Sequence, residues 1–311
     1  MRRVIICGLG AVGITFGCKL RETGANEACS LDSGLSACNL KILADEKRIE
    51  KYKLNKPVFN GVEQDFEYIL PTDCFDADLI IICTKAQGLE SAIQMIKNFV
   101  SEKTRIISLI NGISSEGEIL RAYPNAEVLK SYFIGHSAVR DGNSTTQDGV
   151  GEIVTEKDEV LEEIFKSAGI NYSTPDNIDY TMWLKFTLNI FSNQTSAILK
   201  LNFGEMKHNK HFMDFARKII NEVRLIAEEH GVQGLENLEK DAFEKFNKMR
   251  DDGKTSMFQD VLAKRPTEVD IFAGEIIRLG KKYNIPTPYN QVLYDLIKIE
   301  EERNEHSIHT C

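Results

Sequence analysis

Three glycines near the N-terminus have the spacing of a turn that binds phosphate groups. Gly8, Gly10 and Gly13 follow the apolar run Val4–Cys7, which is typical of a buried strand. Gly8 permits the sharp bend, Gly10 lets the backbone approach a pyrophosphate, and Gly13 lets the next helix pack closely on the strand. The free N–H groups of that helix then face the phosphates. The remaining residues of this predicted cofactor site are Leu9, Ala11 and Val12.

An acidic residue completes this pattern. Asp32 follows the last glycine by about 20 residues, and the segment Glu27–Leu31 can form a second strand that ends at it. A carboxylate there accepts hydrogen bonds from both ribose hydroxyls of NADH, whereas the 2′-phosphate of NADPH would meet like charge. The full pattern favours a dinucleotide site over the alternative, a buried strand followed by a flexible turn.

A second set of polar residues lies along one face of a predicted helix. Lys185, Asn189 and Asn193 follow one another at intervals of four residues, which places them on the same side. The residues between them are mostly apolar, so this helix is expected to be largely surrounded by protein, and its polar stripe needs partners. Taken alone, the stripe is better explained as a solvated face beside the core.

The stripe does not stand alone, because an ordered set of motifs accompanies it and resembles one family. Together with the glycine turn and the lysine–asparagine helix, these motifs resemble the ketopantoate reductase family, also called 2-dehydropantoate 2-reductases. The resemblance covers nearly the whole chain and is specific to the family, though not to one substrate within it. The further motifs are Thr84–Ala86, Asn111–Gly112, Ser256–Asp260 and Arg265–Asp270.

The resemblance implies reduction of a 2-oxo acid to a 2-hydroxy acid by hydride transfer from a nicotinamide held between two domains. Hydride arriving at the keto carbon leaves negative charge on the keto oxygen, so a proton donor or a cation is needed there. Lys185 matches the catalytic lysine of the family. Glu268 matches its acidic partner, which would hold the lysine ammonium group in place.

The same resemblance assigns binding roles to five further polar residues. Asn193 and Ser256 match positions that hydrogen-bond the substrate, and Asn189 matches another polar position lining the site. Asn111 matches an asparagine near both substrate and nicotinamide. Lys85 matches a lysine whose charge could attract an anionic substrate or help to hold the cofactor, with a solvated loop lysine as the alternative.

The chain departs from the family at the residue that selects the cofactor. Many members that use NADPH have an arginine at the end of the second strand, where counting without gaps places Asp32. Ser33 follows it and adds no positive charge. We therefore expect NAD(P)H as the cofactor, with Asp32 favouring NADH and the family resemblance favouring NADPH.

The surrounding elements predict an α/β protein with a Rossmann-type, mostly parallel sheet domain followed by an all-helical C-terminal domain. Continuous apolar runs at Asp78–Thr84 and Arg105–Ile110, with a helical stretch between them, indicate a parallel sheet covered on both faces. Lys85 and Asn111 then follow the carboxyl ends of strands, where such sheets bind ligands. Short strands and turns within Glu127–Glu156 predict antiparallel additions at the sheet edge.

The domain boundary is expected in the turn-rich link Ser173–Asn177. It divides residues 1–175, the dinucleotide-binding domain, from residues 176–311, the helical substrate and catalytic domain. The end of the chain, Glu300–Cys311, is expected to be a frayed, solvated tail rather than a metal site. The predicted C-terminal helices are Thr181–Leu199, Phe212–His230, Leu235–Lys248, Phe258–Ala263, Thr267–Tyr283 and Pro288–Arg303.

Composition narrows the classes of function. The chain has 311 residues, 42% hydrophobic and 27% charged, as expected for an ordinary soluble protein of two domains. A formal net charge of -9 without a long basic run argues against nucleic acid and anionic membranes as partners, and no apolar stretch approaches the ~20 residues of a membrane span. The seven cysteines form no C-x-x-C pair and indicate reduced packing residues, so we expect a cytoplasmic protein without a metal site.

Three functions remain open for the small-molecule site. The first is a ketopantoate reductase making pantoate for pantothenate and coenzyme A biosynthesis. The second is an NAD-dependent 2-hydroxyacid dehydrogenase of the same family acting on another branched or aromatic 2-oxo acid, because a few pocket changes can redirect specificity. The third is a non-catalytic dinucleotide-sensing protein, which would have no reason to retain Lys185 and Glu268 together. A homodimer is open as well, because a helical domain can present an apolar face to a second copy or pack wholly on itself.

Overall fold

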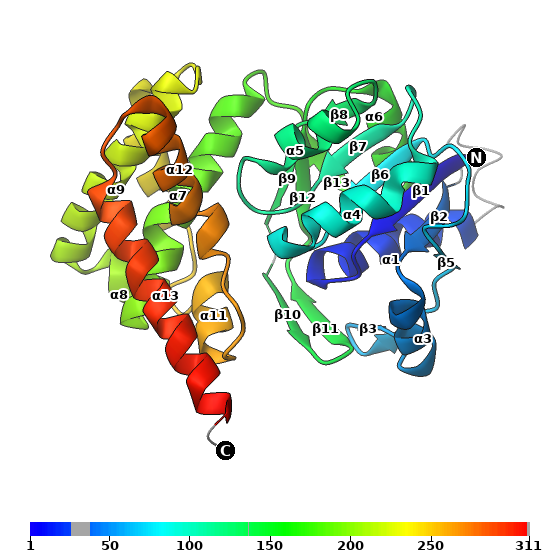
Figure 1. Ribbon diagram of the computed structural model, residues 1–311, viewed down its shortest axis with the longest axis horizontal. Coiled ribbons are helices and arrows are strands. Elements are labelled where there is room, and N and C mark those ends of the chain that lie inside the picture. The colour runs from blue at the N-terminus through cyan, green and yellow to red at the C-terminus, as the bar shows by residue number, and fades with distance from the viewer. Residues whose placement is uncertain (26–37, 136, 310–311) are drawn as a thin grey trace. The chain divides into compact units, whose positions relative to one another are not determined.

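The computed structural model describes residues 1–25, 38–135 and 137–309. The chain divides into two compact units, Met1–Ile178 and Asp179–Cys311, which are described separately as unit 1 and unit 2. Figure 1 labels the elements of both. Within the described ranges, no helix is long and apolar enough to cross a membrane.

Unit 1 is built on a six-stranded sheet with the strand order β5-β2-β1-β6-β7-β8 (Figure 1). Every neighbouring pair in it is parallel. This sheet, its flanking helices and the helical unit 2 confirm the predicted fold class. The strands are β1 (Arg2–Cys7), β2 (Cys38–Leu43), β5 (Tyr68–Ile69), β6 (Leu79–Ile82), β7 (Arg105–Ser108) and β8 (Glu127–Leu129).

Both faces of the sheet are buried. In β1, Val4 and Ile6 belong to a core cluster that includes residues of α1 and α6. Ile5 and Cys7, which alternate with them and therefore face the other way, are 0% exposed as well. This is why the strands are apolar throughout. The helices of unit 1 are α1 (Ala11–Ala25), α3 (Glu46–Leu54), η1 (Ala86–Gly88), α4 (Leu89–Met95), η2 (Ile96–Phe99), α5 (Ser115–Ala122) and α6 (Glu159–Ser167).

Two smaller sheets complete unit 1 and differ from the predicted antiparallel edge additions. Residues 127–129 join the main sheet as its parallel edge strand β8, while the antiparallel pairs β10·β11 and β9·β12 belong to separate sheets. Alternation in a short strand indicates which side chains face inward but not which sheet the strand joins. The strands are β3 (Val58–Phe59), β4 (Val62–Glu63), β9 (Ser131–Ile134), β10 (Ser137–Asp141), β11 (Ser144–Asp148), β12 (Glu152–Thr155) and β13 (Asn171–Ser173).

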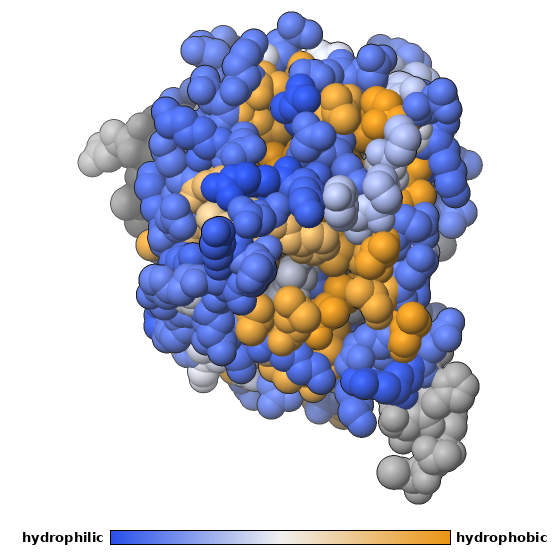
Figure 2. Space-filling model, turned by 90° about the vertical axis from the view of Figure 1, so that its left-hand side faces the viewer, coloured by the Kyte–Doolittle hydropathy of each residue, from blue (hydrophilic) through white to orange (hydrophobic). Residues whose placement is uncertain are grey.

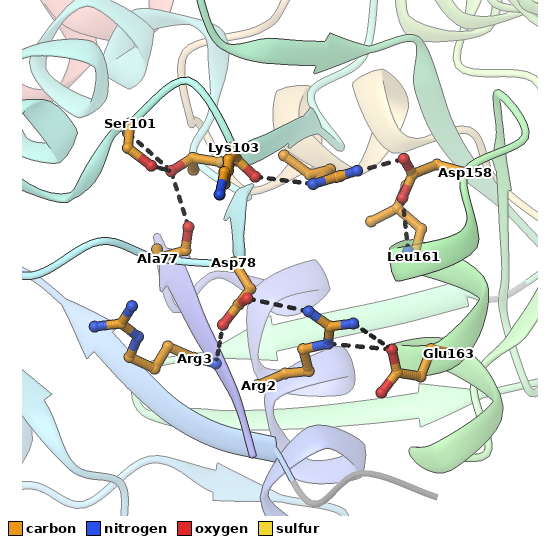
Figure 3. A network of polar contacts seen from close by, with 11 residues as sticks. Arg2, Arg3, Ala77, Asp78, Ser101, Lys103, Asp158, Leu161 and Glu163 are labelled. Atoms are coloured by element: carbon orange, nitrogen blue, oxygen red, sulfur yellow. Dashed lines mark hydrogen bonds and ion pairs between the residues drawn. The ribbon is translucent and has the colours of Figure 1, made fainter.

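Ion pairs tie α6 to the amino ends of the main-sheet strands. At the start of β1, Arg2 Nη2 lies 2.5 Å from Glu163 Oε2, and Arg2 Nη1 lies 3.3 Å from Asp78 Oδ1 (Figure 3). At the start of β7, Arg105 Nε lies 3.2 Å from Asp158 Oδ2, and Asp158 is also the N-cap residue of α6. Such partly exposed pairs contribute about 0–1 kcal/mol each. These ion pairs therefore help to hold α6 against the amino edge of the main sheet.

Within its described residues, unit 2 consists of helices joined by turns and loops, without a strand. The predicted helix Thr267–Tyr283 is divided in the structure, because Phe272 has a non-helical backbone (φ -102°, ψ -97°) and a new helix starts at Ala273. The last helix continues to His309, so the prediction that the chain frays from Glu300 is wrong up to that residue. The elements are α7 (Ile178–Leu199), α8 (Phe203–Lys207), α9 (Lys210–Glu229), η3 (Leu235–Asn237), α10 (Leu238–Asn247), α11 (Ser256–Leu262), η4 (Val269–Ile271), α12 (Ala273–Tyr283) and α13 (Pro288–His309).

One face of α13 carries exposed apolar residues. Val292, Leu296 and Ile299 are 54%, 42% and 61% exposed, and their spacing places them on one side of the helix. Figure 2 shows apolar side chains gathered on the face of unit 2 that it turns toward the viewer.

Candidate functional site

The glycine turn joins β1 to α1, and two of its three glycines have no room for a side chain. Gly8 has φ +104°, and a Cβ atom there would lie 2.8 Å from the backbone nitrogen of Thr84. A Cβ atom at Gly13 would lie 1.9 Å from the carbonyl oxygen of Gly8. At Gly10 a Cβ atom would have one close neighbour among the described residues, Cys83 O at 3.7 Å. The turn therefore packs on the end of β6 and keeps space at Gly10, where a pyrophosphate would approach.

Leu9, Ala11 and Val12 complete the turn and begin α1. Leu9 is 3% exposed and anchors the turn in the core. The helix begins with a hydrogen bond from Ile14 N to Gly10 O at 3.0 Å. Because the first N–H groups of a helix have no acceptor within it, those of the residues before Ile14 are suited to bind an anion.

Polar residues follow the neighbouring strands β6 and β7 at the same carboxyl edge. Thr84 Oγ1 is buried and has no hydrogen-bond partner in the described part of the chain. Lys85 is exposed and precedes η1, while Asn111 is partly buried beside Gly112, which has φ +103°. A buried hydroxyl without a partner is costly, and a polar ligand would relieve this cost. The unpaired hydroxyl and the space at Gly10 fit a dinucleotide.

The acid that follows the strand paired with β1 is Asp45, whereas the predicted cofactor residue Asp32 stays a prediction. The strand paired with β1 is Cys38–Leu43, with Leu43 opposite Cys7. The predicted strand Glu27–Leu31 and Asp32 itself lie outside the described residues.

Asp45 lies at the N-terminus of α3. Its Oδ1 atom accepts a hydrogen bond from Arg48 N at 2.8 Å, and its Oδ2 atom lies 3.4 Å from Arg48 Nε. One residue separates Asp45 from the end of β2. Because the fingerprint acid of a dinucleotide site occupies this position, Asp45 is the residue to test for cofactor choice.

In unit 2, α7 carries the predicted polar stripe on an otherwise buried helix. Lys185 and Asn189 are partly exposed, whereas Asn193 is 6% exposed. Asn193 Nδ2 lies 3.5 Å from Ser256 Oγ, at the start of α11, so the structure brings these two predicted substrate-binding residues together. Asn193 is thus buried, while Lys185 and Asn189 keep part of their surface exposed, so the stripe is solvated only in part.

Glu268 immediately precedes η4 and is 9% exposed. Residues on both sides of it are held by α13. Thr267 N and Thr267 Oγ1 both donate to Glu301 Oε1 at 2.7 Å. Lys298 Nζ donates to Asp270 Oδ2 at 2.9 Å and to Glu301 Oε2 at 3.1 Å. The last helix thus fixes the backbone that carries Glu268.

Sequence reasoning missed the residues that support these groups. Gln194 is 0% exposed, and its Oε1 atom accepts a hydrogen bond from Ala273 N at 3.2 Å, which connects α7 to the start of α12. Its position next to Asn193 on a buried helix was an available signal. Glu301 gave no such signal, because its partner Thr267 is distant in the sequence.

The two cysteines beside the glycine turn are packing residues. Burial raises the pKa of the Cys7 thiol to about 12 and also raises that of Cys83, so both stay protonated at neutral pH. Among the residues that the structure describes, no group of three His, Cys, Asp or Glu side chains could hold a metal ion.

Comparison with known proteins gives matches along nearly the whole chain. The family model "Ketopantoate reductase PanE/ApbA" matches residues 4–158, and "Ketopantoate reductase PanE/ApbA C terminal" matches residues 177–301. A 2-dehydropantoate 2-reductase of Lactococcus lactis is 30% identical over 96% of this chain and 98% of its own. A D-mandelate dehydrogenase solved with NADH and anilino(oxo)acetate has a TM-score of 0.83 at 25% identity, covering 97% of this chain and 99% of its own. A PanE/ApbA family ketopantoate reductase from Ralstonia eutropha JMP134 has a TM-score of 0.81 at 24% identity, covering 98% and 100%.

Proposed function

The chain belongs to the ketopantoate reductase family, and from that premise we propose that it reduces ketopantoate to pantoate, a step of pantothenate biosynthesis. It is an NAD(P)-dependent oxidoreductase that interconverts a keto group and a CH–OH group. The observation that best supports ketopantoate as the substrate is the 30% identity to the Lactococcus 2-dehydropantoate 2-reductase across both chains.

In this proposal unit 1 binds the nicotinamide dinucleotide at the carboxyl edge of its sheet. The N–H groups at the start of α1 bind the pyrophosphate, and Gly10 provides the room for its approach. The Thr84 hydroxyl gains a hydrogen-bond partner, and Lys85 and Asn111 bind near the nicotinamide end. When bound, the reduced nicotinamide supplies a hydride for the keto carbon.

Unit 2 supplies the groups that act on the keto acid. The Lys185 ammonium group stabilises the charge that develops on the keto oxygen and donates the proton that completes the hydroxyl group. Glu268 keeps this lysine charged and oriented. Asn189, Asn193 and Ser256 orient the substrate by hydrogen bonds, and the contact between Asn193 and Ser256 supports a shared role.

Steady-state oxidation of NADH and NADPH by the purified protein tests this function. Ketopantoate is compared with 2-oxoisovalerate and with benzoylformate, an aromatic 2-oxo acid. We expect the highest kcat/KM with ketopantoate. A higher value with another acid would overturn the substrate and keep the reaction class, whereas cofactor binding without turnover of any acid would favour a sensor.

We further propose that NADH is preferred over NADPH, with Asp45 as the selecting residue. The carboxylate following β2 can accept from the ribose hydroxyls, and it repels a 2′-phosphate. Arg48 could bind such a phosphate, but its guanidinium is paired with Asp45. The solved D-mandelate dehydrogenase, 25% identical to this chain, contains NADH.

Asp45→Asn tests this preference while keeping a side chain that can cap α3. We expect the NADPH to NADH ratio of kcat/KM to rise about tenfold, which corresponds to relief of about 1.4 kcal/mol of like-charge repulsion. Asp73→Asn, at another aspartate that accepts from a backbone N–H, is the matched control. An unchanged ratio in Asp45→Asn would remove Asp45 from cofactor selection.

Two further expectations concern the whole protein. We expect it to work in the cytoplasm, which cell fractionation tests.

We expect a homodimer in solution, which light scattering of the purified protein tests. A monomeric mass at micromolar concentration would contradict this expectation.

A further inference from the structure

The β10·β11 hairpin brings an arginine to the glycine turn. Arg140, in β10, donates a hydrogen bond from Nη1 to the carbonyl oxygen of Leu9, which lies between the first two glycines of the turn. Its Nε atom donates to Gly142 O at 3.1 Å. The two residues are 131 positions apart in the sequence, so no local pattern connects them.

The position of Arg140 is set by regular structure. It pairs with Thr145 across the hairpin, and Asp141 pairs with Ser144, so residues 142–143 form a two-residue loop. Gly142 has φ +57°, the left-handed conformation that such tight loops require. The hairpin also packs on α1. The guanidinium is therefore held over the turn by a paired strand.

Arg140 adds positive charge where the first two strands end. Burial raises the pKa of the Tyr52 phenol, while the positive charges of Arg140 and Arg48 lower it. Arg48 is paired with Asp45. Within the described residues, Arg140 has backbone carbonyls as hydrogen-bond partners and no carboxylate partner, so none of the described acids neutralises its charge.

We propose that Arg140 binds the diphosphate group of the dinucleotide. A guanidinium group has five N–H donors, and the two contacts to Leu9 and Gly142 leave others for an anion. Phosphate oxygens accept strong, charge-assisted bonds from arginine, and the glycine turn beneath it lacks a cation of its own. This inference rests on the proposed dinucleotide binding and adds a residue from outside the glycine motif.

Calorimetric titration with ADP and with NADH tests the proposal, and ligand-observed NMR titration with adenosine provides the probe without phosphate. In Arg140→Gln we expect ADP and NADH to bind about tenfold more weakly, with adenosine unchanged. The salt dependence of ADP binding should also weaken, because one charge contact is lost. Arg140→Lys, which keeps the charge, should restore part of the affinity. Arg121→Gln removes an exposed arginine of α5 and is the control for net charge.

Two results would overturn the role of Arg140 without affecting the proposed dinucleotide binding. Unchanged ADP affinity in Arg140→Gln would show that the guanidinium does not contact the diphosphate. An equal loss for ADP and adenosine, together with a lower melting temperature, would show that Arg140 only holds the turn in shape. Failure of the unaltered protein to bind NADH or ADP would instead overturn dinucleotide binding itself, and this inference with it.

Discussion

The glycine turn of unit 1 and helix α7 of unit 2, the two proposed ligand-binding elements, are built in opposite ways. The turn packs backbone on backbone, so that a Cβ atom at Gly13 would lie 1.9 Å from Gly8 O. Helix α7 instead buries polar side chains: Gln194 and Ser196 are 0% exposed, and both make hydrogen bonds. A site made of backbone depends on residues that lack side chains, whereas a site made of side chains depends on partners elsewhere in the fold.

The largest expected effect removes a side chain from α7. Lys185→Ala should lower kcat about 1000-fold, because the keto oxygen loses its proton donor, while the Kd for NADH stays the same. Single-turnover kinetics and fluorescence titration measure the two quantities. Lys240→Ala, at an exposed lysine of α10, is the control. A large loss of NADH affinity in Lys185→Ala would break the division of roles between the units.

The next effect adds a side chain to the turn. Gly13→Ala should weaken NADH binding about 100-fold, because α1 must move away from β1 by roughly 1 Å to admit the new methyl group. Gly117→Ala in α5 is the matched control, since a Cβ atom there meets nothing within 4 Å. Calorimetric titration of both variants with NADH measures the two affinities. Equal NADH affinity in the two would mean that the turn is not the binding element.

A smaller effect is expected at Glu301, which holds the backbone next to Glu268. Glu301→Ala removes the acceptor of both Thr267 hydrogen bonds and should lower kcat about tenfold, equivalent to about 1.4 kcal/mol. Glu301→Gln keeps an acceptor oxygen and should restore most of kcat. Glu300→Ala, which loses a pair with Arg303, is the control. If Glu301→Ala lowers the melting temperature and leaves kcat unchanged, α13 stabilises unit 2 without positioning Glu268.

The same contrast explains how far the sequence could predict this protein. The glycine turn was predictable because each glycine is required by contacts within one strand–turn–helix motif and the adjoining β6. The lysine–asparagine stripe was predictable as a helix face because its spacing is local. Parallel pairing and the helical C-terminal half followed from apolar runs and from the loss of strand signals.

The remaining features depend on distances along the chain that no local pattern contains. Asp45 was not proposed because counting from the glycines without gaps leads to Asp32, whereas Asp45 is identified by the pairing of β2 with β1. Arg140 reaches Leu9 from a separate sheet. Glu301 was assigned to a solvated tail because a run of charged residues resembles one, although α13 holds it against Thr267.

The smallest expected effect concerns a partly buried carboxylate of unit 1 that lies outside the turn. Glu116, in the first turn of α5, accepts a hydrogen bond from Ser115 Oγ at 3.1 Å, yet burial raises its pKa from 4.5 to about 7. The folded state therefore binds more protons than the unfolded state between these pH values. The free energy of unfolding should then fall as pH rises from about 4.5 to about 7, and should show no further change from this group above pH 7.

Urea unfolding between pH 5 and pH 8 measures how the free energy of unfolding changes as the Glu116 carboxylate becomes charged. Glu116→Gln cannot ionise, so its stability should decline less across this range than that of the unaltered protein. Glu118→Gln removes a carboxylate from the same helix and is the control for net charge. Parallel profiles for Glu116→Gln and the unaltered protein would mean that the carboxylate is solvated when charged. A flatter profile for Glu116→Gln would show that unit 1 carries a measurable penalty for a buried charge. The backbone N–H groups that we propose as the dinucleotide's partners at the glycine turn do not titrate and carry no such penalty.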